Sequence, residues 1–180
     1  MQELLEILRA MVAKKDEVEN RRELFHEVAE RVVKHACSAF GAKPDEVAIL
    51  MTTSDGRHLR FVAPRKFADL GTIPITKRDS IAVNVFAKKT GEAMNNVPMV
   101  KHVAFFESVK IRDRPVAPIQ KMITVPIVAD GEAVGVAQIS RKGDTPAEAG
   151  PDFTPADLKK AQSLFEEVGP YLMNTRPDRF

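Results

Sequence analysis

The side chains that could carry out chemistry are few and widely spaced in this sequence of 180 residues. Thiol chemistry would depend on Cys37, the single cysteine, and proton transfer on four histidines, which are His26, His35, His58 and His102. No two histidines have the HxH or HxxxH spacing that presents two ligands to one metal. The sequence also lacks a glycine-rich phosphate loop, a nucleophile elbow and a metalloprotease helix. We therefore expect no catalytic residue and no metal site.

Cys37 falls on the apolar stripe of an expected helix that ends near Gly41. A thiol in such a position usually behaves as a small hydrophobic side chain and is not a nucleophile. A lone cysteine also excludes an intrachain disulfide and any site built from cysteines alone. We expect an inert thiol.

A long connection from Met99 to Pro118 is expected to be a functional loop because of its length. It places His102 beside Phe105 and Phe106, which makes this histidine the best candidate for a haem or ligand contact. A half-exposed loop histidine is the simpler interpretation. The basic residues in and beside the loop outnumber Glu107 and Asp113; they are Lys101, Lys110, Arg112, Arg114 and Lys121. Their field would attract an anionic ligand such as a nucleotide, carboxylate or amino acid, unless the long side chains simply extend into solvent.

Two runs rich in β-branched residues, Met122 to Val128 and Val134 to Ile139, flank an Asp-Gly turn and predict a hairpin. Alternation divides their side chains between two faces. One face is apolar, with Ile123, Val125, Ile127, Ala137 and Ile139. The other carries Met122, Thr124, Gln138 and Ser140. The apolar face suits packing against helices, and the mixed face suits a small-molecule pocket.

Apolar residues recur at spacings of three and four from Leu4 to Val12 and again from Leu24 to Cys37. This pattern predicts one long helix or two in tandem. The interval from Lys14 to Glu23 is almost entirely polar, so we favour a break close to Asp16.

Further elements follow in a mixed order. Val47 to Thr52 and Leu59 to Ala63 predict a second hairpin, and Met94 to Val97 a brief strand. A short helix follows Asp79-Ser80 and carries Asn84, a polar candidate for the pocket; Asn95 and Asn96 are either pocket residues or part of a turn.

The last helix is expected from Pro155 to Met173. Thr154 is its N-cap, Asp157 completes a near capping box, and Pro170 is expected to distort the last turn. Arg176 to Phe180 is interpreted as a loose tail.

With these motifs in this order, the chain from about Glu23 to Leu172 resembles a GAF domain. The motifs are Thr90-Gly91-Glu92, Val125-Pro126-Ile127, Gly135-Val136 and Phe153-Thr154-Pro155-Ala156-Asp157. The resemblance implies an α+β, PAS-related fold in which a central antiparallel sheet of five to six strands carries the N- and C-terminal helices on one face and a ligand pocket on the other. On this basis residues 1–22 form an N-terminal helical extension, 23–173 the GAF-like domain and 174–180 a C-terminal tail.

Known uses of the family are only partly matched. Members that bind cyclic nucleotides carry an Asn-Lys pair where Ser140-Arg141 stands, and Phe153 and Asp157 are retained while Leu158 replaces an acid. A structural role for Phe153 and Asp157 is the favoured interpretation. Members that reduce methionine sulfoxide resolve one cysteine with another, which a single thiol cannot do within one chain. Bilin-binding members attach the chromophore in the pocket region, whereas Cys37 lies in a different element.

The composition limits the class of protein. The length suits one domain, and a formal charge of +2 gives no reason to expect nucleic acid or an anionic membrane surface. There is no apolar run of the roughly 18–20 residues that span a bilayer, and the N-terminus is acidic, unlike a secretory signal. We expect a cytoplasmic protein.

The sequence thus favours a small-molecule sensor in intracellular signalling that is not an enzyme. Its ligand would bind against Asn84, His102, Phe105, Phe106, Met122, Thr124, Gln138 and Ser140. No output domain follows the last helix, so the signal is expected to pass between chains, through a homodimer of the terminal helices or a signalling protein partner. The alternatives are an interaction module with a vestigial pocket and, less favoured, an enzyme acting on a small anionic substrate. The residues name neither the ligand nor a cofactor.

Overall fold

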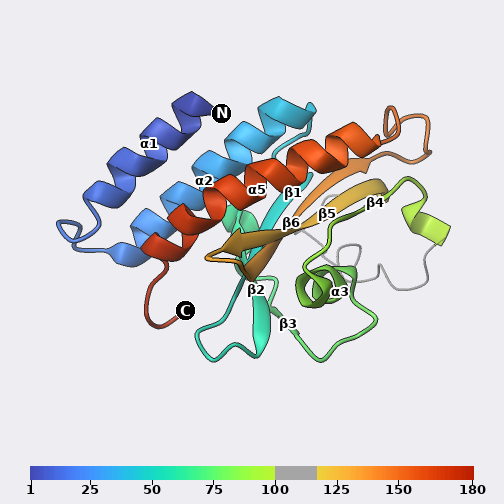
Figure 1. The fold of residues 1–180 in the computed structure, drawn as a ribbon. Helices are drawn as coiled ribbons and strands as arrows, with labels where there is room; N and C mark the ends of the chain where they lie inside the picture. The colour runs from blue at the N-terminus through green and yellow to red at the C-terminus, as the bar shows by residue number, and fades with distance from the viewer. Residues whose placement is uncertain (100–116) are drawn as a thin grey trace.

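The computed structural model describes residues 1–99 and 117–180 (Figure 1). Six strands of this described part form one antiparallel sheet in the order β3-β2-β1-β6-β5-β4. The strands are β1 (Val47–Thr52), β2 (His58–Ala63), β3 (Thr72–Pro74), β4 (Glu92–Met94), β5 (Ile119–Ala129) and β6 (Glu132–Lys142). The expected α+β fold with five to six strands is confirmed.

Helices cover both faces of the sheet (Figure 1). The helices α1 (Gln2–Ala13), α2 (Arg21–Phe40) and α5 (Pro155–Thr175) share one core cluster with the sheet. Helix α3 (Ile81–Lys88) shares a second cluster with the opposite face. Two short 3₁₀ turns, η1 (Arg65–Phe67) and η2 (Val97–Met99), complete the described elements.

The N-terminal region is two helices, as the polar interval predicts. Helix α1 ends at Ala13, and α2 starts after Asn20, whose side chain accepts a hydrogen bond from the Glu23 amide at 3.1 Å. The break therefore includes Asp16. Leu4 and Leu8 of α1 are buried, so this helix packs its apolar stripe onto α2 and α5.

The long hairpin separates its side chains as alternation predicts. Ile123, Val125, Ile127, Ala137 and Ile139 lie in the cluster beneath α1, α2 and α5. Met122 lies in the cluster beneath α3. The sheet is thus buried on both faces. Consecutive side chains of β5 and β6 alternate between the cluster beneath α1, α2 and α5 and the cluster beneath α3.

Helix α5 begins with a complete capping box. Thr154 Oγ1 accepts from the Asp157 amide at 3.1 Å, and Asp157 Oδ2 accepts from the Thr154 amide at 2.8 Å. The helix continues through Pro170 to Thr175, two residues beyond the predicted end.

Two boundary predictions were wrong. The brief strand occupies Glu92–Met94, not Met94 to Val97, because Glu92 is the residue that pairs with Thr124 and Pro98 has no amide to continue a ladder. The segment from Arg176 to Phe180 is docked, not loose, because Arg176 bonds to Thr52 at the end of β1 and Phe180 bonds to Ser54 in the turn between β1 and β2.

Candidate functional site

A row of polar side chains crosses three neighbouring strands on the α3 side of the sheet. Glu92 of β4 pairs with Thr124 of β5, which pairs with Gln138 of β6, and Gln138 in turn pairs with Ala48 of β1. Directly paired residues in antiparallel strands project from the same face. Ala48 belongs to the cluster beneath α3, which fixes the face of the whole row.

Thr124 and Gln138 form the centre of this row. Their exposed fractions are 1% and 5%, and Gln138 Nε2 donates a hydrogen bond to Thr124 Oγ1 at 3.3 Å. Within the described residues, no group donates to the amide oxygen of Gln138. A buried amide normally satisfies both of its ends, because leaving an acceptor unpaired costs about 1–3 kcal/mol. The buried Thr124–Gln138 pair is therefore the polar feature that a binding site on this face would use.

The other two hairpin candidates have different roles. Ser140 Oγ donates to the main-chain oxygen of Glu46 at 3.0 Å, so its hydroxyl fastens the start of β1 to β6. Met122 is 2% exposed and packs into the apolar cluster beneath α3. The structure brings all four predicted hairpin residues to one face, and it leaves Thr124 and Gln138 as the polar pair.

Glu92 is a member of the row that the sequence reasoning missed. Its carboxyl is partly buried, and this desolvation raises its pKa, while the charge of Lys88 acts in the opposite direction. No described residue hydrogen-bonds its side chain. In the sequence, the position of Glu92 directly after Thr90-Gly91 could have indicated the start of a strand. The structure shows that this edge strand places Glu92 opposite Thr124. Glu92 thus adds to the row another acceptor that no described residue bonds.

Asn84 does not join the row. Its Nδ2 donates to the main-chain oxygen of Arg78 at 3.0 Å and so fastens the segment before α3. The predicted contacts His102, Phe105 and Phe106, and the basic residues Lys101, Lys110, Arg112 and Arg114, lie outside the described residues.

Lys121 was expected to contribute to a positive field, but it is 5% exposed and already paired. Its Nζ lies 2.8 Å from Asp152 Oδ1 and 2.5 Å from the Gly150 main-chain oxygen. It ties β5 to the segment before α5 and is not available to attract a ligand.

Phe153 and Asp157 have structural roles, as favoured from the sequence. Asn95 donates to the Phe153 main-chain oxygen at 2.9 Å and accepts from the Phe153 amide at 2.8 Å. The Arg141 guanidinium carbon lies 4.3 Å from the centroid of the Phe153 ring. Asp157 is the capping residue of α5. The half-matched cyclic-nucleotide signature is thus explained by how α5 begins.

Two of the candidate reactive side chains, Cys37 and His26, are engaged elsewhere. Cys37 lies on α2 with its Sγ 3.6 Å from the Lys43 main-chain oxygen, and burial raises the pKa of this thiol. His26 Nδ1 lies 3.1 Å from the Val62 main-chain oxygen.

In residues 1–99 and 117–180, no three His, Cys, Asp or Glu side chains are grouped as metal ligands. No helix of this described part has the length and apolarity to cross a bilayer.

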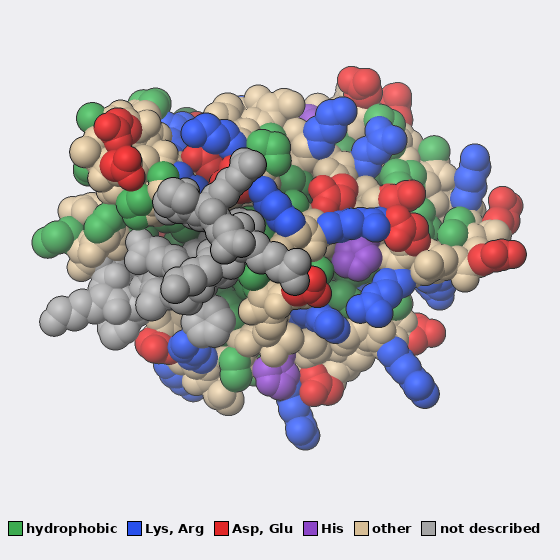
Figure 2. All heavy atoms as spheres, turned by 180° about the vertical axis from the view of Figure 1, so that it is seen from behind, with side chains coloured by type: hydrophobic (Ala, Val, Ile, Leu, Met, Phe, Trp, Pro, Cys, Tyr) green, Lys and Arg blue, Asp and Glu red, His purple; other side chains and the backbone are tan. Residues whose placement is uncertain are grey.

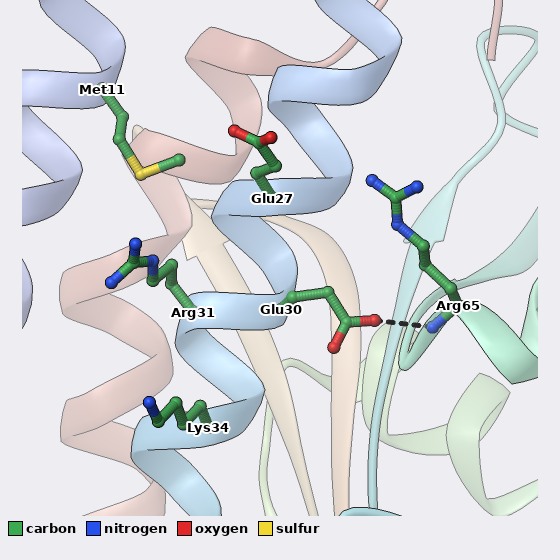
Figure 3. A pocket seen from close by; sticks show the side chains of 6 residues that line it. All are labelled: Met11, Glu27, Glu30, Arg31, Lys34 and Arg65. Carbon is green, nitrogen blue, oxygen red and sulfur yellow. Dashed lines mark hydrogen bonds between the residues drawn. The ribbon is translucent and has the colours of Figure 1, made fainter.

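A hollow of about 500 Å³ lies on the other side of the molecule, over α2 (Figure 3). Met11 of α1 and Arg65 of η1 flank it, and four charged residues of α2 line it: Glu27, Glu30, Arg31 and Lys34. Glu30 Oε1 accepts from the Arg65 amide at 2.6 Å, and the Arg65 guanidinium pairs with Glu23. The α2 charges therefore line a concave surface. Seen from the opposite side to Figure 1, the protein carries basic and acidic side chains interspersed over the visible surface (Figure 2).

Comparison with known proteins agrees with this architecture. The family model of the GAF domain matches residues 25–171. A sequence search of curated proteins finds no significant match.

Several solved structures share the fold. The GAF domain of a phosphoenolpyruvate-protein phosphotransferase from Coxiella burnetii superposes with a TM-score of 0.64 at 14% identity, covering 96% of this chain and 94% of that one. The corresponding domain from Acinetobacter gives 0.63 at 14% identity, covering 94% and 92%. A type II free methionine-R-sulfoxide reductase from Thermoplasma acidophilum gives 0.59 at 17% identity, covering 87% and 97%. Likeness at these identities establishes the fold alone.

Proposed function

Because this chain belongs to the GAF domain family, we propose that it is a regulatory module that binds a small molecule on the α3 side of its sheet. The buried Thr124–Gln138 pair, whose amide oxygen accepts no hydrogen bond from a described residue, is the observation that carries this proposal. A small-molecule site combines an apolar wall with a few converging polar groups. Met122 and Val136 supply such a wall beside the pair.

The row also restricts the chemistry of the ligand. The Gln138 amide oxygen and the Glu92 carboxyl both accept hydrogen bonds, so the ligand must present donors to them. An anionic group elsewhere on the same ligand would suit the basic residues of the connection between η2 and β5, as expected from the sequence. We place the module in the cytoplasm, in keeping with its lone cysteine.

The ligand signal would leave through β5 and α5. Thr124 faces the ligand side, whereas the adjacent Val125 faces α5. Gly91 lies in the same contact: a Cβ placed on it would be 2.9 Å from Val125 Cγ1 and 3.2 Å from Leu158 Cδ1. A small displacement of β4 or β5 on ligand binding would therefore change the position of α5. Such a ligand acts by favouring one of two arrangements of the helix.

The proposal is tested by a thermal-shift screen with nucleotides, amino acids and small carboxylates. The variant T124V/Q138M removes the polar pair and approximately keeps its volume. The control T72V/Q2M makes the same exchanges at exposed positions. We expect a compound that raises the Tm of the native protein and the control, with the shift lost in T124V/Q138M. Equal shifts in all three proteins would exclude this site.

A second candidate, an interaction module that pairs with a second copy, is favoured by the charges of α2. Leu8 and Leu164, on the apolar stripes of α1 and α5, are buried within this chain, so a partner must meet other faces. The outer side of α2 carries acids at 27 and 30 and bases at 31 and 34 (Figure 3). An antiparallel pairing of two α2 helices about a twofold axis would set Glu27 opposite the second copy's Lys34.

Sedimentation velocity of charge-reversal variants tests this pairing. E27K and K34E should each weaken the dimer, because each sets like charges opposite one another, and E27K/K34E should restore it. The control K159E reverses an exposed charge on α5 and should leave the dimer unchanged. A native protein that stays monomeric at all concentrations would exclude the interaction module.

A further inference from the structure

The segment after α5 returns to the turn between β1 and β2 and is fixed there by the main chain. The Ser54 amide donates to the Phe180 main-chain oxygen at 3.0 Å, and the Phe180 amide donates to Ser54 Oγ at 2.8 Å. Ser54 Oγ in turn donates to the Asp178 main-chain oxygen at 2.8 Å. One serine therefore uses both its amide and its hydroxyl to hold two residues of the segment.

The Phe180 side chain docks beside the same turn. Its ring meets the fully buried Phe25 ring of α2 edge to face, with centroids 5.1 Å apart and an interplanar angle of 81°. The Arg60 guanidinium carbon lies 5.7 Å from the Phe180 centroid. Edge-to-face and cation–π contacts each add to simple burial of the ring. Phe25, Ser54 and Arg60 together form what we call the aromatic socket.

The turn that presents Ser54 holds its own shape. Asp55 Oδ1 accepts from Thr53 Oγ1 at 2.6 Å and from the Arg57 amide at 3.0 Å, and the His58 amide donates to Thr53 Oγ1 at 3.1 Å. The Thr53 and Arg57 bonds lower the pKa of Asp55. None of these bonds involves the segment 176–180. The socket would thus keep its geometry when the segment leaves.

The segment also links distant elements. Arg176 Nη1 donates to the Thr52 main-chain oxygen at 3.1 Å, and Thr52 Oγ1 donates to the Val134 main-chain oxygen at 3.1 Å. These bonds connect the end of α5 to β1 and β6, which is the strand that carries Gln138. Asp178 and Arg179 are exposed, so the docked stretch is narrow and open to water. A segment held by one partly buried ring and a few hydrogen bonds can open locally without global unfolding.

We propose that residues 176–180 are a latch that fixes the C-terminal end of α5 when Phe180 occupies the aromatic socket and frees it when Phe180 leaves. The occupant of the socket is this chain's own segment. The latch does not depend on the α3-side ligand site, because it involves separate residues. It gives α5 a second control, at the end of the helix opposite the capping box.

Amide hydrogen exchange on the full chain tests the latch. In the native protein the Ser54 amide should exchange faster than the amides in the middle of β1, which open only with the whole sheet. In F180A its exchange should accelerate by at least about tenfold while β5 amides stay unchanged. R179A, which alters an exposed neighbour, is the control and should match the native protein.

Three exchange results would overturn the proposal. If Ser54 exchanges only with global unfolding, or if F180A accelerates exchange across the whole sheet, Phe180 is a permanent part of the core. If F180A leaves Ser54 exchange unchanged, the segment is not docked.

A synthetic peptide of residues 174–180 gives a second measurement. Added to F180A, the peptide should slow the exchange of the Ser54 amide again. Failure at every soluble concentration would show that the socket has no affinity for this segment.

Discussion

At the scale of single residues, the polar side chains of this protein divide into those that satisfy each other and those that do not. Thr154 with Asp157, Asn95 with Phe153, and Lys121 with Asp152 are closed sets, in which each group finds its partner within the chain. The Gln138 amide oxygen and the Glu92 carboxyl have no such partner among the described residues. Substitutions in the closed sets should therefore change the stability of the fold. Substitutions of Gln138 or Glu92 should change ligand binding.

The first prediction concerns the cap of α5. Replacing Thr154 by Ala removes the acceptor for the Asp157 amide and should lower the free energy of unfolding by about 1 kcal/mol. The control S163A removes a hydroxyl from the exposed side of the same helix and should have almost no effect. Urea unfolding of the three proteins measures the difference, and equal losses in both variants would argue against the cap.

The second prediction is a pH dependence that depends on Asp157. The hydrogen bonds from the Thr154 amide and hydroxyl lower the pKa of Asp157. A carboxyl whose pKa is lower in the folded than in the unfolded state contributes stability above the unfolded value, and loses it as the pH falls through the folded one. The native protein should therefore lose its advantage over D157N as the pH falls below about 4. A constant difference from neutral to acid pH would show that Asp157 acts through packing alone.

At the scale of elements, α5 is placed by one close approach to the sheet. A Cβ on Gly169 would overlap the Val128 carbonyl oxygen and lie 2.7 Å from its carbon. A side chain there would have to push the helix away from β5. The absence of a side chain at Gly169 therefore allows α5 to pack directly against the main chain of β5, so that a displacement of β5 would displace α5.

The third prediction follows from this close packing. In an exposed helix, Gly to Ala would stabilise by about 1 kcal/mol, but at position 169 the added methyl meets main-chain atoms and should destabilise by about 1–3 kcal/mol. Thermal unfolding of G169A beside S163A gives the sign. A stabilised G169A would mean that α5 can lift from β5 without cost.

Local signals explain which elements were predictable. The break between α1 and α2, the two faces of the long hairpin and the start of α5 each depend on residues a few positions apart, which sequence patterns report. The docking of Phe180 on Ser54, the pairing of Glu92 with Thr124 and the ion pair of Lys121 join residues far apart in the sequence. Such partners come together only when the sheet forms, so composition and periodicity could not reveal them.

At the scale of the whole molecule, the sheet separates two halves with different roles. Helices α1, α2 and α5 cover one face of the sheet and α3 lies on the other (Figure 1). The polar row lies on the α3 side, and the charged hollow lies over α2 (Figure 3). Helix α5 contacts β5, and the other face of the same strand carries Thr124. A ligand on one side and a partner on the other would then be coupled through the same strands.

Native mass spectrometry tests this account most directly. The full chain and T124V/Q138M are each incubated with a low-molecular-weight metabolite extract, exchanged into volatile buffer, and measured under native and denaturing conditions. We expect an added mass on the native protein that is lost on denaturation and absent from the variant. A native protein that retains no added mass, or a variant that retains the same one, would contradict a ligand site at Thr124 and Gln138.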